Sequence, residues 1–155
     1  MENGAFKGGV FMIRKMKSED KAEVMRMMKF FYLSPAVSTN GSDEIFERDI
    51  EACLSDDDSL EGFVFEIDEE LAGYAMLARG FCTELGRKCV WLEDLFVIPE
   101  FRRKGFADDF LGYIRENYRD CAVRLEVEKA NKPANALYKK YGFKSFPYNE
   151  LYLEI

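Results

Sequence analysis

The chain has 155 residues, of which 48% are hydrophobic and 15% aromatic, and its formal net charge is −7. This length and composition predict one globular domain with a continuous core, and the acidic charge argues against nucleic acid and anionic membranes as partners. The sequence contains no histidine, which excludes serine–histidine and cysteine–histidine nucleophile chemistry and nearly every catalytic zinc site, so we expect no metal.

The predicted elements begin after a short N-terminal segment. Residues 1–11, which include three Gly, one Asn and one Glu, predict a flexible extension, and the domain is expected to span residues 12–155. A first strand is expected over residues 11–16. Two helices follow in the prediction, the first capped by Ser18 and the second over residues 44–54.

Apolar segments joined by short polar turns predict a run of antiparallel strands in the middle of the chain. These three strands are expected over residues 61–67, 71–79 and 88–97. The remaining elements are expected to be a helix over 106–118, a strand over 122–128, a helix over 133–141, and closing strands over 143–146 and 151–155. This order predicts a single mixed α+β domain, with a largely antiparallel central sheet flanked by about four helices.

The four cysteines form no C-x-x-C pair, which disfavours a metal knuckle. We interpret them as small buried side chains in a reducing cytosol rather than as a disulfide framework. No secretory signal is visible at the N-terminus, and no apolar run approaches the ~18 residues of a membrane span. We therefore expect a cytoplasmic protein with no membrane partner.

Residues 97–107 read V-I-P-E-F-R-R-K-G-F-A, a strand that runs into a basic loop with one glycine, which in turn opens a helix. Such a junction presents unpaired backbone N–H groups and the positive end of a helix dipole, which is the arrangement that a diphosphate needs. Gly105 lets the chain pass close to phosphate oxygens. The alternative is a surface loop with a solvated basic run, and the pattern is neither a P-loop nor a Rossmann loop.

Residues 131–143 read N-K-P-A-N-A-L-Y-K-K-Y-G-F, a short helix that follows a strand and is closed by Gly-Phe. Together with the R-x-x-G-x-A pattern of the basic loop, this sequence resembles the GNAT superfamily of N-acetyltransferases. The resemblance covers residues 12–155 and includes the order of strands and helices. It implies the GNAT acyl-CoA N-acyltransferase fold.

The resemblance also implies a site for acetyl-CoA as the cosubstrate. Backbone groups of Phe96 and Val97 would pair with the pantetheine arm like an added strand. Asn131 would hydrogen-bond the cofactor arm, and Lys140 would approach a phosphate or the ribose. The backbone amides expected to hold the diphosphate are those of Arg102, Arg103, Lys104, Gly105, Phe106 and Ala107.

Two residues are candidates for acid–base catalysis. Tyr138 would lie near the sulfur, where its hydroxyl could protonate the leaving thiolate, unless it is a core aromatic residue. An amine like that of Lys, with a pKa near ~10.4, must lose a proton before it attacks, and a carboxylate acting directly or through water is the expected acceptor. Glu93 is the candidate because it precedes Val97 by four residues, which places both on one face of a strand. Asp94 faces oppositely unless a bulge intervenes, and Glu93 could instead be an edge or dimer-contact residue.

The segment L-E-D-L-F-V at residues 92–97 resembles that of spermidine/spermine and diamine N-acetyltransferases, in which the equivalent Glu lies near the substrate amine. The resemblance implies direct transfer of an acetyl group, in a ternary complex, to a primary amine of a small cationic molecule, and it also implies a homodimer. Two departures are Ala107 in place of the usual second glycine and the absence of an acidic cluster at residues 32–35. The alternatives are acetylation of a protein N-terminus or lysine, and a non-catalytic acyl-CoA-binding module.

Overall fold

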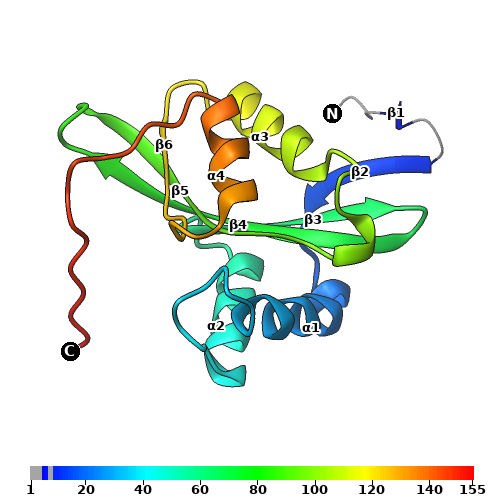
Figure 1. Cartoon of the computed structure of the whole chain (residues 1–155). Helices are drawn as coiled ribbons and strands as arrows, with labels where there is room; N and C mark the ends of the chain where they lie inside the picture. The colour runs from blue at the N-terminus through cyan, green and yellow to red at the C-terminus, as the bar shows by residue number, and fades with distance from the viewer. Residues whose placement is uncertain (1–4, 7–8) are drawn as a thin grey trace.

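The computed structural model describes residues 5–6 and 9–155, which form one mixed sheet with helices on both of its faces (Figure 1). The strands, in their order across the sheet, are β1 (Ala5–Phe6), β2 (Gly9–Lys15), β3 (Leu60–Ile67), β4 (Glu70–Cys82), β5 (Arg87–Val97) and β6 (Ala122–Leu125). The helices are α1 (Lys21–Tyr32), α2 (Asp43–Leu54), α3 (Phe106–Asn117) and α4 (Lys132–Lys140), with short 3-10 turns at Ser18–Asp20 and Pro99–Phe101.

Sequence order and sheet order coincide, because the strands up to β5 are joined by connections that return the chain antiparallel to its neighbour. α3 connects β5 to β6, so these two strands are parallel. In the view of Figure 1, α1 and α2 lie below the sheet, and α3 and α4 lie above it. This architecture confirms the predicted mixed α+β class, with its largely antiparallel sheet and four helices.

Two apolar cores follow from this layering, because alternate residues of a strand face opposite sides of the sheet. The core on the α3 side includes Phe63, Phe65, Leu77, Leu92, Phe106 and Phe110. The core on the side of α1 and α2 includes Val24, Met28, Phe46, Ile50, Tyr74 and Phe96. Helix spacing explains α3, in which Phe106, Phe110 and Ile114 are all nearly fully buried.

Several predicted boundaries change. The strand expected over 122–128 ends at residue 125, and residues 143–146 and 151–155 form no strand in the described chain. Leu151 and Ile155 are fully exposed, so the alternating pattern of this tail has no sheet partner to bury it. Ser18 begins the 3-10 turn rather than capping a helix, and no side-chain hydrogen bond caps α1.

The predicted domain start at Met12 falls inside a strand. β2 begins at Gly9, and the side chain of Phe11 is 4% exposed because it packs in the α3-side core. Residues 1–4 and 7–8 lie outside the described residues, so the flexibility expected of residues 1–11 stays a prediction. Within the described residues, no helix is long and apolar enough to cross a membrane.

Candidate functional site

β5 and β6 run side by side over only part of their length. Their parallel pairing joins residues 89–92 of β5 to residues 122–125 of β6. β5 continues to its end paired with β4 on the other side, so its edge over residues 93–97 has no neighbouring strand in the described part of the chain. Backbone N–H and C=O groups on this open edge can pair with an extended ligand as they would with an added strand.

Phe96 and Val97, predicted to meet the cofactor arm, both lie on this open edge. The Phe96 side chain is 4% exposed and packs in the core on the α1 side, so only its backbone is available to a ligand. The Val97 C=O accepts a hydrogen bond of 3.0 Å from Nε of Arg102. Gly73 pairs with Val97, and a Cβ at Gly73 would lie 2.2 Å from the Phe96 carbonyl oxygen, so glycine is required for this strand approach.

The open edge begins at a β-bulge. Asp94 pairs with Met76 and Leu92 pairs with Leu77, which leaves Glu93 as the extra residue of β5. The prediction that Glu93 and Val97 share one face assumed that side chains alternate regularly along β5. The bulge interrupts this alternation at Glu93. The bulge therefore reorients the Glu93 side chain at the point where β5 loses its pairing with β6.

The Glu93 side chain is exposed at the bulge and lies close to other carboxylates. Desolvation raises its pKa, and the negative charges of Glu150 and Asp49 raise it further. The pKa of Glu126 is raised to about 7, chiefly by a hydrogen bond with Glu150 and also by desolvation and the charge of Glu93. Glu93, Glu126 and Glu150, which we call the carboxylate cluster, thus converge from β5, the segment after β6 and the C-terminal tail.

Asp94 is buried on the α1 side of the bulge, with an exposed fraction of 4%. Its Oδ2 accepts a hydrogen bond of 2.7 Å from the Tyr74 hydroxyl, and its Oδ1 accepts one of 3.1 Å from the Tyr32 hydroxyl. Burial raises the pKa of Asp94 to about 6, although the two tyrosine hydroxyls oppose this shift. Asp94 thus remains on the face opposite Val97, as expected for the regular strand that follows the bulge.

The N-terminus of α3 is open. Its N-cap residue is Gly105, with a left-handed φ of +90°, and no side chain caps the helix. The Asp109 N–H donates to the Gly105 carbonyl at 2.9 Å, which closes the first turn of the helix. The Phe106 side chain is buried in the core, so this residue, like Phe96, offers a ligand its backbone alone.

Positive charge surrounds this helix end, because Arg102, Arg103 and Lys104 are all exposed. The first turn of α3 also carries Asp108, whose Oδ1 lies 2.5 Å from Nζ of Lys140. Lys140 thus neutralises an acidic residue at the helix N-terminus, and its approach to a phosphate or the ribose stays a prediction. This ion pair leaves the positive end of the dipole available to an anion.

α4 carries Tyr138 and Asn131. The Tyr138 ring packs against the α3-side core and contacts Phe143 edge-on, with ring centroids 5.6 Å apart. Its hydroxyl has no hydrogen-bond partner among the described residues, and burial raises its pKa to about 12, which keeps it a neutral donor. Oδ1 of Asn131 caps α4 by accepting from the Ala134 N–H at 3.3 Å, so the side-chain NH2 group of Asn131 remains as a donor.

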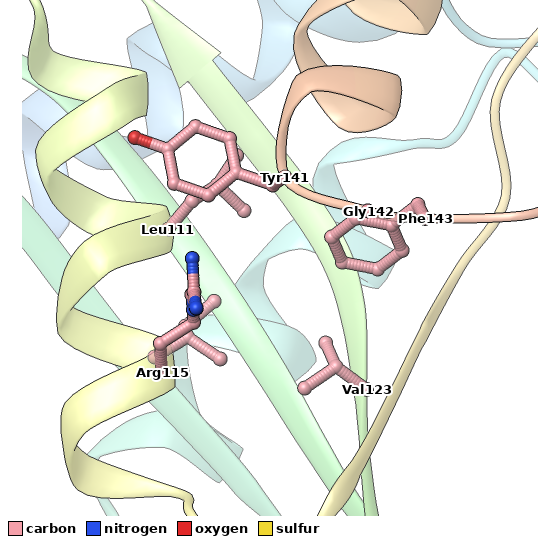
Figure 2. Close-up of a pocket in the computed structure, with 7 residues that line it drawn as sticks. Leu111, Arg115, Val123, Tyr141, Gly142 and Phe143 are labelled. Atoms are coloured by element: carbon pink, nitrogen blue, oxygen red, sulfur yellow. The ribbon is translucent and has the colours of Figure 1, made fainter.

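A small cavity of about 180 Å³ lies between α3, β6 and the segment that follows α4. In Figure 2, Val123 of β6 and Phe143 lie across the cavity from α3, while the Tyr141 ring extends toward Leu111 of α3. None of the residues predicted to bind or catalyse lines this cavity. None of its lining residues belongs to β5.

Sequence reasoning missed several residues of the site. Glu126 and Glu150 lie near Glu93 only through the path of the chain after β6, which no spacing reveals. The hydrogen bonds from Tyr32 and Tyr74 to Asp94 join three different elements. The one available signal in the sequence was the charge of Asp94 within an apolar strand, because a buried carboxylate requires hydrogen-bond donors around it.

The acetyltransferase (GNAT) family matches the chain over residues 23–143. Thialysine N-epsilon-acetyltransferase of Caenorhabditis elegans is 39% identical over 83 residues, which are 52% of this chain and 51% of that protein, so the match spans about half of that relative. An uncharacterized N-acetyltransferase of Bacillus subtilis, YhfO, is 26% identical over 137 residues, covering 84% of this chain and 88% of that protein.

Solved structures show the same fold. A possible acetyltransferase from Clostridium difficile 630 superposes with a TM-score of 0.79 at 19% identity, covering 94% of this chain and 97% of that one. The aminoglycoside N-acetyltransferase AAC(6')-Iy, solved in complex with CoA, has a TM-score of 0.77 at 21% identity, with 96% of this chain and 97% of that one covered.

Proposed function

Because the chain belongs to the acetyltransferase (GNAT) family, we propose that it is an acetyl-CoA-dependent N-acetyltransferase whose acceptor is a primary amine of a small cationic molecule, such as a diamine or polyamine. The carboxylate cluster of Glu93, Glu126 and Glu150 carries this proposal. The negative charge of Glu150 raises the pKa values of Glu93 and Glu126, and an ammonium group bound among the three carboxylates would relieve that repulsion.

Acetyl-CoA fits two features of the described chain, the β5 edge that no strand covers and the N-terminus of α3 that no side chain caps. The open edge of residues 93–97 suits the extended pantetheine arm, and the backbone amides of residues 102–107 suit the diphosphate at the α3 N-terminus. The Asn131 side-chain NH2 remains as a donor to the arm. Lys140 acts on the diphosphate indirectly in this proposal, because it holds the charge of Asp108.

Acetyl-CoA supplies an activated acetyl group, and the chain's own residues handle the protons. Glu93 takes the proton from the acceptor ammonium, directly or through a water, and its raised pKa makes it a better base than an ordinary glutamate. A backbone N–H of the open edge near Val97 donates to the carbonyl oxygen as negative charge develops there. The neutral Tyr138 hydroxyl protonates the departing sulfur.

Relatives support a small amine acceptor. The nematode relative is named for acetylation of thialysine, and AAC(6')-Iy is named for aminoglycosides. These names describe the acceptors of those proteins. For this chain, the carboxylate cluster is the feature that supports a cationic amine as the acceptor. We propose direct attack in a ternary complex, because an acceptor bound at the cluster lies beside the edge assigned to the arm.

The activity is tested by mixing the protein with acetyl-CoA and a panel of acceptors while following the release of free thiol. The panel contains diamines, polyamines, lysine analogues, neutral amines, and peptides with a free N-terminus or lysine. We expect turnover with the dicationic amines and little with neutral ones. Preference for the peptides would overturn the small-amine proposal, and tight CoA binding without turnover would point to a non-catalytic module.

We also propose a cytoplasmic homodimer. The four free thiols at Cys53, Cys82, Cys89 and Cys121 suit a reducing compartment. The exposed apolar tail over residues 151–155 and the outer edge of β6 are two unpaired surfaces that a second copy could cover. Light scattering coupled to size exclusion measures the molar mass, and a monomer at micromolar concentration would contradict the dimer.

A further inference from the structure

A buried carboxylate sits beside the candidate base without a cation. No Lys or Arg of the described chain forms an ion pair with Asp94, although only 4% of Asp94 is exposed. Burying a charge in this way is unfavourable unless hydrogen bonds replace the lost water. The hydroxyls of Tyr32 and Tyr74 supply those bonds, one to each carboxylate oxygen. Losing either hydroxyl leaves a buried oxygen unsatisfied.

The two donors differ in what they connect. Tyr74 is fully buried within β4, so its bond to Asp94 joins two neighbouring strands. Tyr32 is the last residue of α1 and is half-buried, and its ring packs 4.9 Å from that of Phe46 in α2. Its bond to Asp94 therefore joins the β5 bulge to the start of the connection between α1 and α2, residues 33–42.

This connection, which we call the α1–α2 loop, is held at three places. At its beginning Tyr32 bonds Asp94. Near its end Gly41 has a φ of +60° and lies so close to Phe46 and Tyr32 that a Cβ there would be 2.4 Å from the Phe46 ring. In its middle the Ser38 hydroxyl hydrogen-bonds the carboxylate of Glu128, in the segment between β6 and α4.

The loop thus spans from the bulge on β5 to the segment after β6, and the carboxylate cluster lies between the same two elements. Glu93 is the bulge residue next to Asp94, and Glu126 is two positions before Glu128. A shift of the loop would change the shape of this region, whereas none of the three anchors named above involves the N-terminus of α3 at Gly105.

We propose that the Tyr32–Asp94 hydrogen bond is a latch that seats the α1–α2 loop beside the carboxylate cluster and thereby sets the affinity for the acceptor amine. Tyr32 and Asp94 are positioning residues, because they act through the loop and the bulge rather than by touching the acceptor. The effect of the latch on the affinity for the amine rests on the proposed function, whereas its effect on the position of the α1–α2 loop is independent of that function.

The decisive variant is Tyr32→Phe, which removes the latch hydroxyl and keeps the ring that packs on Phe46. Tyr118→Phe is the matched control, because it removes a tyrosine hydroxyl that donates to another carboxylate, Glu61, at 2.8 Å, away from the loop. We expect Tyr32→Phe to raise the KM for the amine by about tenfold, the usual weight of a hydrogen bond to a charged group. The KM for acetyl-CoA should change by less than about twofold in both variants.

A second measurement needs no substrate. Amide hydrogen exchange across residues 33–42 should be faster in Tyr32→Phe than in wild type and unchanged in Tyr118→Phe. Ser38→Ala, which alters an exposed side chain at the other anchor, should loosen the same amides and raise the amine KM less than additively with Tyr32→Phe.

Two results would overturn the latch. One is wild-type exchange across the loop in Tyr32→Phe. The other is an equal rise in the KM values for amine and acetyl-CoA, matching that of Tyr118→Phe, which would mark Tyr32 as a residue of general stability. If wild type acetylates no amine, the proposed function fails, while the exchange data still decide whether the latch exists.

Discussion

The carboxyl group of Glu126 lies within hydrogen-bonding reach of that of Glu150, which brings the C-terminal tail beside the segment after β6. Such a bond needs one proton between two carboxylates, and together with desolvation and the charges of Glu150 and Glu93 it raises the pKa of Glu126 from 4.5 to about 7. The proton is thus held in the folded protein at pH values where the unfolded chain has released it.

Stability should therefore fall as the pH rises toward neutrality. A raised folded-state pKa gives a contribution that is complete below the unfolded value of 4.5 and is lost as the pH passes through about 7. Urea unfolding of wild type and Glu150→Gln between about pH 5 and pH 8 measures this difference. The variant should lose this part of the pH dependence, and parallel curves for the two proteins would contradict the shared proton.

Acceptor binding should respond in the opposite direction. As Glu126 ionises near pH 7, the carboxylate cluster gains negative charge while an aliphatic amine, with a pKa near ~10.4, stays cationic. The KM for a diamine should then decrease as the pH rises from about 6 to 8, and Glu150→Gln should shift this decrease to lower pH. A KM that is flat over this range would separate Glu126 from the acceptor site.

The sequence predicted the elements that depend on local periodicity and missed those that depend on partners. The spacing of Phe106, Phe110 and Ile114 reports one buried helix face, whatever the rest of the chain does, and α3 was predicted nearly to the residue. The alternating apolar pattern of residues 151–155 shows which side chains a strand would bury, but it does not show whether a neighbouring strand is present. With no neighbouring strand at this position, the described tail stays extended and exposed.

The same distinction applies within the site. The open N-terminus of α3 follows from a glycine before an apolar helix, so Gly105 could be identified locally. The bulge at Glu93 could not, because β5 reads as a regular strand and the extra residue is defined only by its pairing with β4. The ion pair of Lys140 could not be predicted either, because its partner Asp108 lies on another helix.

Tyr138→Phe should lower kcat by about 10²- to 10⁴-fold, the range expected for loss of a general acid. Its hydroxyl bonds to no described residue, so the midpoint of thermal unfolding and the affinity for CoA should barely change. Steady-state kinetics with calorimetric CoA binding separates these effects. Tyr118→Phe serves as a control that keeps wild-type kcat, and equal losses of turnover and CoA affinity would make Tyr138 a packing residue.

Glu93→Gln should remove the base while keeping the shape of the bulge. The rate kcat/KM for the amine should fall, and the acidic limb of its pH profile should flatten, because the raised pKa of Glu93 no longer governs proton removal. Asp94→Asn is a less direct comparison, since its carboxylate is buried and bonded to two tyrosines. An unchanged pH profile in Glu93→Gln would assign proton removal to another group.

Gly105→Ala should weaken CoA binding, because the diphosphate is proposed to contact backbone amides held by the left-handed conformation of Gly105. At a φ of +90°, alanine is strained by about 1–2 kcal/mol, and relief of that strain moves the amides at the start of α3. Gly86→Ala is the matched control: its φ is also positive, at +60°, and it lies in the β4–β5 turn with no atom within 4 Å of the added Cβ. Both variants should lose similar unfolding free energy in urea, but only Gly105→Ala should bind CoA about tenfold more weakly by calorimetry. Equal CoA affinity in the two variants would place the diphosphate elsewhere.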